Sequence, residues 1–186
     1  MEFTVLKTRV KISPLFFAVL TAFLLADRGG IAAAVISFSL LHELCHFAAL
    51  GALKKAPREV NISAAGISMR LCGMSTAERV LVFAAGAAGN FAAAALCFAA
   101  DRKLFCGVNL AIGIFTMLPL CSTDGGSIFA ALAEKFFPER AKQLCKAVFT
   151  ACGAITAAAL FAAAAVYENP YLLIGAFYAV ICLIKY

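Results

Sequence analysis

Residues 40–50 read L-L-H-E-L-C-H-F-A-A-L and lie in an apolar run whose one charged residue is Glu43. His42 and His46 are the only two histidines of the chain. On a helix these positions share a face about one turn apart, so both imidazoles can hold one zinc ion. Glu43 would then act as general base for a bound water. Burying these three groups in an apolar span costs several kcal/mol, so their presence indicates a function.

The composition predicts an integral membrane protein. Hydrophobic residues make up 64% of the 186 residues, charged residues make up 14%, and the mean hydropathy is +0.96. Soluble domains are about half apolar and about a quarter charged. We expect a single membrane domain over residues 1–186, with its core at 29–126. The net charge of +6 is spread between apolar runs, so nucleic acid is not an expected partner.

We predict an all-α polytopic fold with about six transmembrane helices. Six apolar runs are separated by charged residues: Ile12–Ala26, Gly29–Leu53, Val80–Ala100, Leu104–Thr123, Ala147–Val166 and Pro170–Ile184. The middle four are long enough to cross about 30 Å of hydrocarbon. The N-terminus, the loops at 54–79 and 135–146, and Lys185 together carry 13 of the 16 lysines and arginines. This bias predicts that both termini are cytoplasmic.

Two segments between the apolar runs have patterns of their own. Residues 58–71 alternate apolar and polar on both sides of Ala65–Gly66, which predicts a small membrane-associated β-hairpin. A plain polar loop is the alternative. Residues 126–137 form a short amphipathic stretch ended by Pro138, and we expect this stretch to lie at the membrane interface.

A catalytic zinc site needs a third protein ligand besides the two histidines. Among the acidic residues, Asp124 differs because it ends an uncharged apolar span and precedes Gly125–Gly126, where the backbone can turn closely around a site. Most other carboxylates lie at termini or in charged loops. We therefore expect one Zn²⁺ per chain, bound by His42, His46 and Asp124. The alternative is a membrane-anchored zincin with a cytoplasmic active site and Glu78 as its third ligand.

Three motifs together resemble the site-2 protease family of intramembrane metalloproteases, most closely its short sporulation forms of the IVFB type. The H-E-x-x-H motif of a transmembrane helix is matched by His42, Glu43 and His46. The G-x-x-x-N motif of an intervening helix is matched by Gly86 and Asn90. The aspartate motif is matched in T-M-L-P-L-C-S-T-D-G-G by Pro119, Asp124, Gly125 and Gly126. Order, spacing and membrane context agree over roughly residues 10–135.

The resemblance assigns roles to individual residues. It implies that Glu43 is the catalytic base and that Asn90 and Thr116 contact the substrate. Thr116 stands where the family usually has asparagine, and residues 121–123, Cys-Ser-Thr, replace the usual Pro-Pro-Leu. The soluble C-terminal regulatory domain of some relatives is not expected here.

The resemblance also implies an activity and a location. We expect an intramembrane zinc endopeptidase in the lipid bilayer of a bacterial inner membrane. Its expected substrate is a transmembrane or membrane-associated protein, such as a sigma-factor precursor or an anti-sigma factor, cleaved in regulated intramembrane proteolysis. An inhibitory membrane partner is expected by analogy with the sporulation relatives. Besides the zincin described above, the alternative is an inactive scaffold that binds transmembrane segments.

Overall fold

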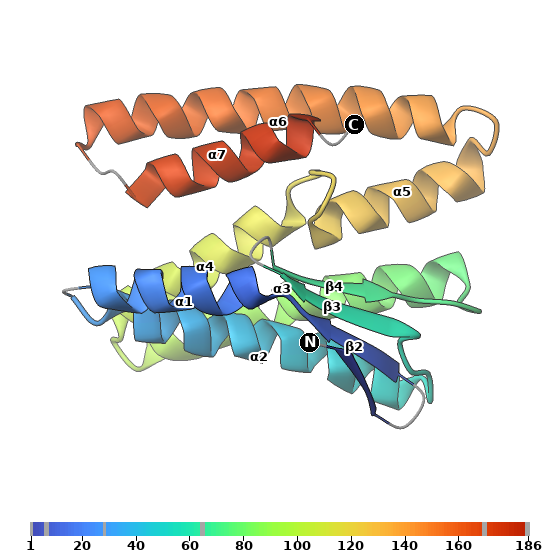
Figure 1. Ribbon diagram of the computed structural model, residues 1–186, viewed down its shortest axis with the longest axis horizontal. Coiled ribbons are helices and arrows are strands. Elements are labelled where there is room, and N and C mark those ends of the chain that lie inside the picture. Colours follow the sequence, from blue (N-terminus) through green and yellow to red (C-terminus); the bar gives the residue numbers. More distant parts are fainter. Residues whose placement is uncertain (1, 6–7, 28, 64–65, 169–170, 185–186) are drawn as a thin grey trace. The chain divides into compact units, whose positions relative to one another are not determined.

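The predicted fold class is confirmed: the protein is helical, with one small sheet (Figure 1). The computed structural model describes all residues except 1, 6–7, 28, 64–65, 169–170 and 185–186. It contains two compact units, residues 1–115 and 116–186, and each is described by itself. The organisation as one membrane domain stays a prediction.

The first unit contains four apolar helices. They are α1 (Pro14–Ala26), α2 (Ile31–Ala52), α3 (Thr76–Ala99) and α4 (Lys103–Met117), the last two residues of which belong to the second unit. Among the described residues, α2, α3 and α6 (Ala141–Val166) are long and apolar enough to cross a membrane. The protein is therefore an integral membrane protein. The count of six spans stays a prediction, because α1, α4 and α7 (Tyr171–Ile184) have only 13 to 15 residues.

The first unit also contains a four-stranded sheet in the order β1-β2-β3-β4. Its strands are β1 (Glu2–Val5), β2 (Thr8–Ile12), β3 (Glu59–Ser63) and β4 (Gly66–Arg70). Strands β3 and β4 pair antiparallel, which confirms the predicted hairpin. Strands β1 and β2 were not predicted. They pair antiparallel with each other, and β2 pairs parallel with β3.

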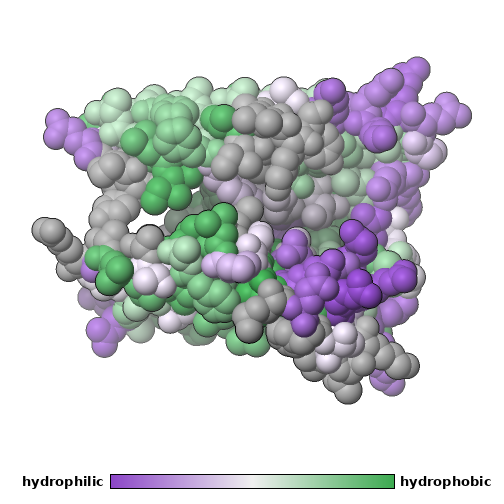
Figure 2. Space-filling model, in the orientation of Figure 1, coloured by the Kyte–Doolittle hydropathy of each residue, from purple (hydrophilic) through white to green (hydrophobic). Residues whose placement is uncertain are grey.

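Charged side chains gather on the sheet (Figure 2). Glu59 lies 3.1 Å from Lys11 and 3.8 Å from Arg70. The hydrogen bond from Lys11 and the positive charges around it hold the pKa of the Glu59 carboxyl below its ordinary value. The sheet therefore carries a cluster of ion pairs, unlike the apolar helices of the first unit.

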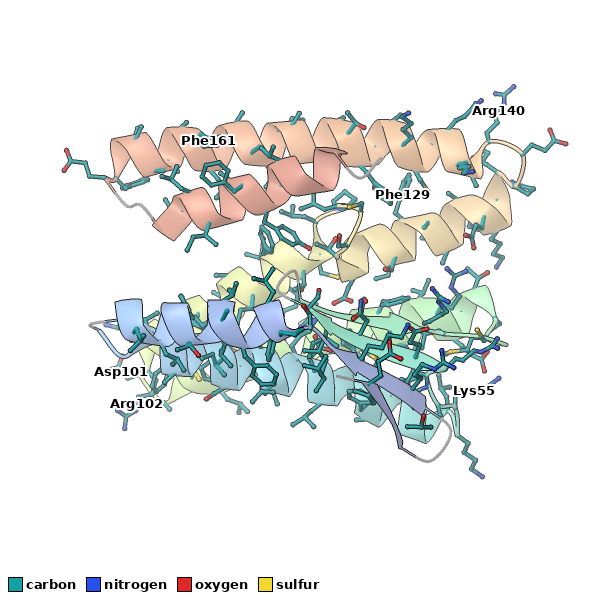
Figure 3. All side chains as sticks on the ribbon, in the orientation of Figure 1. Lys55, Asp101, Arg102, Phe129, Arg140 and Phe161 are labelled. Carbon is teal, nitrogen blue, oxygen red and sulfur yellow. The ribbon has the colours of Figure 1, made fainter. Side chains whose placement is uncertain are left out.

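Helix α2 carries the two histidines, and both of its ends are polar. Before its first turn, Asp27 accepts hydrogen bonds from the backbone N–H groups of Ala32, at 2.8 Å, and Gly29, at 3.0 Å. Beyond its last turn lies Lys55. Figure 3 shows Lys55 at one end of the first unit and Asp101 and Arg102 at the opposite end. The histidines lie between these charged ends, in the apolar part of the helix.

The second unit consists of α5 (Asp124–Phe136), α6 and α7. The amphipathic stretch predicted at 126–137 is helix α5, which begins two residues earlier. Its inner face packs on α6, where Phe129 and Phe149 have ring centroids 6.0 Å apart. Phe161 of α6 and Phe177 of α7 are in a similar edge-to-face contact at 5.8 Å. Two aromatic pairs therefore join the three helices.

The helix in this part of the chain is shorter than the predicted apolar span at 104–123. Helix α4 ends at Met117, and residues 118–123 form turns before α5 begins at Asp124. Pro119 disfavours helical conformation in the residue before it and cannot donate a backbone hydrogen bond. Asp124 therefore does not end an apolar helix, as we expected, but begins an amphipathic one.

Candidate metal centre

Helix α2 places the imidazoles of His42 and His46 against each other. The two side chains are 5% and 2% exposed. Their Nε2 atoms lie 3.1 Å apart, and the two ring planes are nearly perpendicular, at 88°. The four-residue spacing therefore produces the shared face that the sequence predicts.

Helix α3 holds both imidazoles by hydrogen bonds to their Nδ1 atoms. The Nδ1 atom of His46 lies 2.7 Å from the backbone carbonyl oxygen of Val82, and the Nδ1 atom of His42 lies 2.7 Å from Asn90 Oδ1. A carbonyl oxygen only accepts hydrogen bonds, so each Nδ1 carries the proton that it donates. In the neutral imidazoles, each Nε2 then has a lone pair. These two lone pairs face each other.

This arrangement matches a metal site. Two nitrogen lone pairs that face each other at 3.1 Å repel, whereas a cation that both of them ligate removes the repulsion. Two nitrogen ligands of a tetrahedral zinc ion, each about 2.0–2.1 Å from it, lie about 3.3 Å apart. Metal-binding histidines characteristically donate their second N–H to a carbonyl or carboxylate oxygen, as both do here. The residues present therefore suit zinc.

Gly86 allows α3 to approach the histidines. A β-carbon at this position would lie 2.5 Å from His46 Nε2 and 2.6 Å from His42 Cε1. Both contacts are closer than packed atoms tolerate. Nearby, a β-carbon at Gly89 would collide with the sulfur of Cys45. The G-x-x-x-N segment therefore contributes a flat helix surface at Gly86 and a hydrogen-bonding amide one turn later at Asn90.

Glu43 follows His42 directly on α2. Its side chain is half-buried, and its Oε2 atom is buried. Its carboxylate is carried by the same helix as the two imidazoles, one residue after the first of them. The place of Glu43 therefore agrees with its expected role as a general base.

Asn90 is completely buried and makes three hydrogen bonds. Its Oδ1 accepts from His42, and its Nδ2 donates to Phe38 O at 3.2 Å and to Asn109 Oδ1 at 3.0 Å. The amide therefore connects α2, α3 and α4 and orients a candidate ligand. The substrate contact expected for Asn90 stays a prediction.

Asn109 was not predicted from the sequence as a residue of the site. It is as buried as Asn90, and its Nδ2 donates to the carbonyl oxygen of Phe105 at 2.9 Å. The available signal was an amide in the middle of an otherwise apolar helix, where polar side chains usually bond a neighbouring helix.

Asp124 lies in the second unit, in the first turn of α5. Thr123 is the N-cap of this helix: its Oγ1 accepts hydrogen bonds from Gly126 N at 3.3 Å and Leu120 N at 3.2 Å. The two glycines after Asp124 pack directly against the backbone of the preceding turn, where a β-carbon would collide with Met117 O or Leu120 O. Thr123, one of the departures from the family pattern, thus fixes the backbone beside Asp124.

The three other departures, Thr116, Cys121 and Ser122, belong to the second unit as well. Thr116 lies in the last turn of α4, and Cys121 Sγ lies 3.3 Å from Ser122 Oγ in the following turn. The expected substrate contact of Thr116 stays a prediction.

Glu78 is held in a helix cap. Its carboxylate accepts a hydrogen bond from Ser75 N at 2.7 Å, and its own backbone N–H donates to Ser75 Oγ at 3.3 Å. Together these bonds form a capping box at the start of α3. Lys55 lies 3.9 Å away and provides an ion pair. This role at a helix end disfavours the alternative in which Glu78 ligates zinc.

Comparison with known proteins shows the fold. No protein-family model and no curated protein matches the sequence. A solved structure, the Site-2 Protease from Methanocaldococcus jannaschii, is similar with a TM-score of 0.72. The alignment covers 100% of this chain and 94% of that chain, at 13% sequence identity. The fold expected from the three motifs is therefore confirmed.

Proposed function

We propose that the protein is an intramembrane zinc endopeptidase of the site-2 protease family. The observation that carries this proposal is the pair of buried imidazoles, His42 and His46, whose Nε2 atoms face each other at 3.1 Å while both Nδ1 atoms are held by α3. The shared fold adds support. The H-E-x-x-H pattern supplies the chemistry that a fold alone does not specify.

The proposed ligands are His42, His46 and Asp124, with one zinc ion per chain. Two imidazoles and a carboxylate are a donor set that catalytic zinc accepts, with the fourth position left for water. A bound zinc ion would lower the pKa of such a water and polarise the scissile carbonyl. Asp124 is chosen for its chemistry, for the close backbone turn at Gly125–Gly126, and because Glu78 is committed to a helix cap.

The residues of the chain supply the proton transfers. Glu43 accepts a proton from the attacking water and then donates it to the nitrogen of the leaving peptide. The Nδ1–H bonds of the two histidines keep both rings in the tautomer that leaves Nε2 available. The chain has no other histidine, so a serine or cysteine nucleophile activated by a separate histidine is disfavoured.

The proposed substrate is a transmembrane or membrane-associated protein. A transmembrane helix protects its peptide carbonyls by hydrogen bonds, so the substrate must unwind locally before cleavage. Sigma-factor precursors and anti-sigma factors are the proposed class, in a bacterial inner membrane with both termini of the enzyme cytoplasmic. An inhibitory membrane partner is proposed with them.

Replacing Asp124 and Glu78 in two separate variants should identify the third zinc ligand. We expect Asp124→Asn to bind far less than one zinc per chain, because an amide is a weaker zinc ligand than a carboxylate. Glu78→Gln should keep one zinc per chain, because glutamine can also accept the hydrogen bond from the backbone of Ser75. Elemental analysis of the purified protein in detergent measures both. The reverse result would favour the zincin with a cytoplasmic active site.

Strand β4 is one of the two edge strands of the sheet, and we propose that it binds the unwound substrate by adding a strand. Proline at position 67 removes a backbone donor from this strand. Ile67→Pro should therefore reduce cleavage of a single-pass membrane protein about tenfold, while zinc content stays at one per chain. Unchanged cleavage would count against strand addition but not against the metal site.

A further inference from the structure

The buried amide of Asn109 is a polar group that the proposed function does not yet explain. It lies in the apolar helix α4 and is completely buried. Its Nδ2 donates to Phe105 O in its own helix, so its Oδ1 is the atom turned toward Asn90. Because Phe105 O can only accept, this contact fixes which way the Asn109 amide points.

The orientation of Asn109 determines the orientation of Asn90. The Nδ2 group of Asn90 has two hydrogens, and its two partners, Phe38 O and Asn109 Oδ1, are both acceptors. Its Oδ1 is then the only atom left for His42. A flipped Asn90 would place an oxygen against two oxygens, so the network strongly disfavours the flip.

The orientation of Asn90 in turn determines the tautomer of His42. An oxygen acceptor stabilises the Nδ1–H form, in which Nε2 has the lone pair that a metal needs. A flipped Asn90 would instead offer an N–H donor to Nδ1 and stabilise the Nε2–H form. In the series of hydrogen bonds from Phe105 O to His42 Nδ1, each donor and each acceptor is therefore fixed by the next group in the series.

We propose that Asn109 is a positioning residue that keeps His42 in its metal-binding tautomer through Asn90. It acts on the metal site without touching it, from a third helix of the first unit. The inference rests on the proposed function only for the identity of the metal. The tautomer that it assigns to His42 can be measured with no metal bound.

The test compares Asn109→Leu with the conservative Asn109→Asp. Leucine has a similar size and offers Asn90 no acceptor, whereas a protonated aspartic acid keeps both the acceptor oxygen and a donor for Phe105 O. We expect Asn109→Leu to weaken zinc binding about 10- to 100-fold, as loss of an outer-shell partner does. The zinc affinity of Asn109→Asp should stay within about threefold of the wild-type affinity, because this variant keeps the outer-shell partner. Zinc affinity is measured by competition with a chelator in detergent.

A second measurement separates this inference from the proposed function. The chain has two histidines, so ¹⁵N-histidine labelling gives spectra of only two imidazoles. After chelation, His42 should be the Nδ1–H tautomer in the wild type and in Asn109→Asp, and should shift toward Nε2–H in Asn109→Leu. Unchanged tautomer and zinc affinity in Asn109→Leu would overturn the role of Asn109, as would equal losses in both variants. A wild type that binds no zinc but shows the expected tautomers would overturn the zinc enzyme and leave the positioning role standing.

Discussion

Replacing Glu43 with glutamine should lower the rate of cleavage by about 10²–10⁴ and leave one zinc ion per chain. Glutamine has nearly the same shape as glutamate but cannot accept the proton of the attacking water. The proposed metal ligands are untouched, so zinc binding should persist. The rate is measured with a reconstituted single-pass membrane protein whose transmembrane helix contains glycines, since such a helix unwinds more readily.

A matched control is Glu59→Gln, the same exchange on the sheet. Glu59 forms ion pairs with Lys11 and Arg70 and has no proposed part in proton transfer. This variant should cleave within about twofold of the wild type, because ion pairs near the protein surface contribute little. If Glu43→Gln cleaves as fast as Glu59→Gln, Glu43 is not the base. If the wild type binds zinc and transmembrane segments but cleaves none of them, the scaffold alternative is favoured.

Local patterns were sufficient to predict most helices and one hairpin. The alternation at residues 58–71 has the period of a strand, and the paired strands β3 and β4 follow it. The long apolar runs became α2, α3 and α6. In each of these cases the signal lies within a few neighbouring residues.

Features that depend on distant partners were not predicted. Strand β2 pairs parallel with β3, which follows only after two intervening helices, so nothing near Thr8–Ile12 specifies its partner. The N-terminal basic residues were interpreted only as a topology signal, yet Lys11 also pairs with Glu59. The end of α4 at Met117 was missed because hydropathy stays high through Pro119, although proline carries the local signal for the break.

The same distinction between local patterns and distant partners holds for the candidate site. The spacing of His42 and His46 fixes their shared helix face, so their proximity could be predicted from the sequence. The tautomer of each ring depends on what α3 and α4 place behind it. Asn90 was identified from its motif, but its hydrogen bond to His42 was not predicted, and Asn109 was not identified at all. These hydrogen bonds depend on how the helices pack, and the packing of helices cannot be derived from a single sequence.

Gly86→Ala should strongly weaken zinc binding and cleavage, although it adds only one methyl group. The added β-carbon would meet both imidazoles at 2.5–2.6 Å, so α3 must move away or the rings must rotate. Either change breaks the bonds from Nδ1 of His42 and His46 to α3, whose loss alone weakens metal binding about 10- to 100-fold. We expect zinc affinity to fall at least that far.

The matched control for this exchange is Gly107→Ala in helix α4. A β-carbon at Gly107 has nothing within 4 Å, so the same substitution adds no collision there. Alanine is the better helix former by about 1 kcal/mol, and this control should therefore unfold at an equal or higher temperature. Chelator competition and thermal unfolding are measured on both variants after the metal is removed and again with zinc. Wild-type zinc affinity in Gly86→Ala would mean that the imidazoles do not pack against α3 as described, and the tautomer argument for zinc would then fail with it.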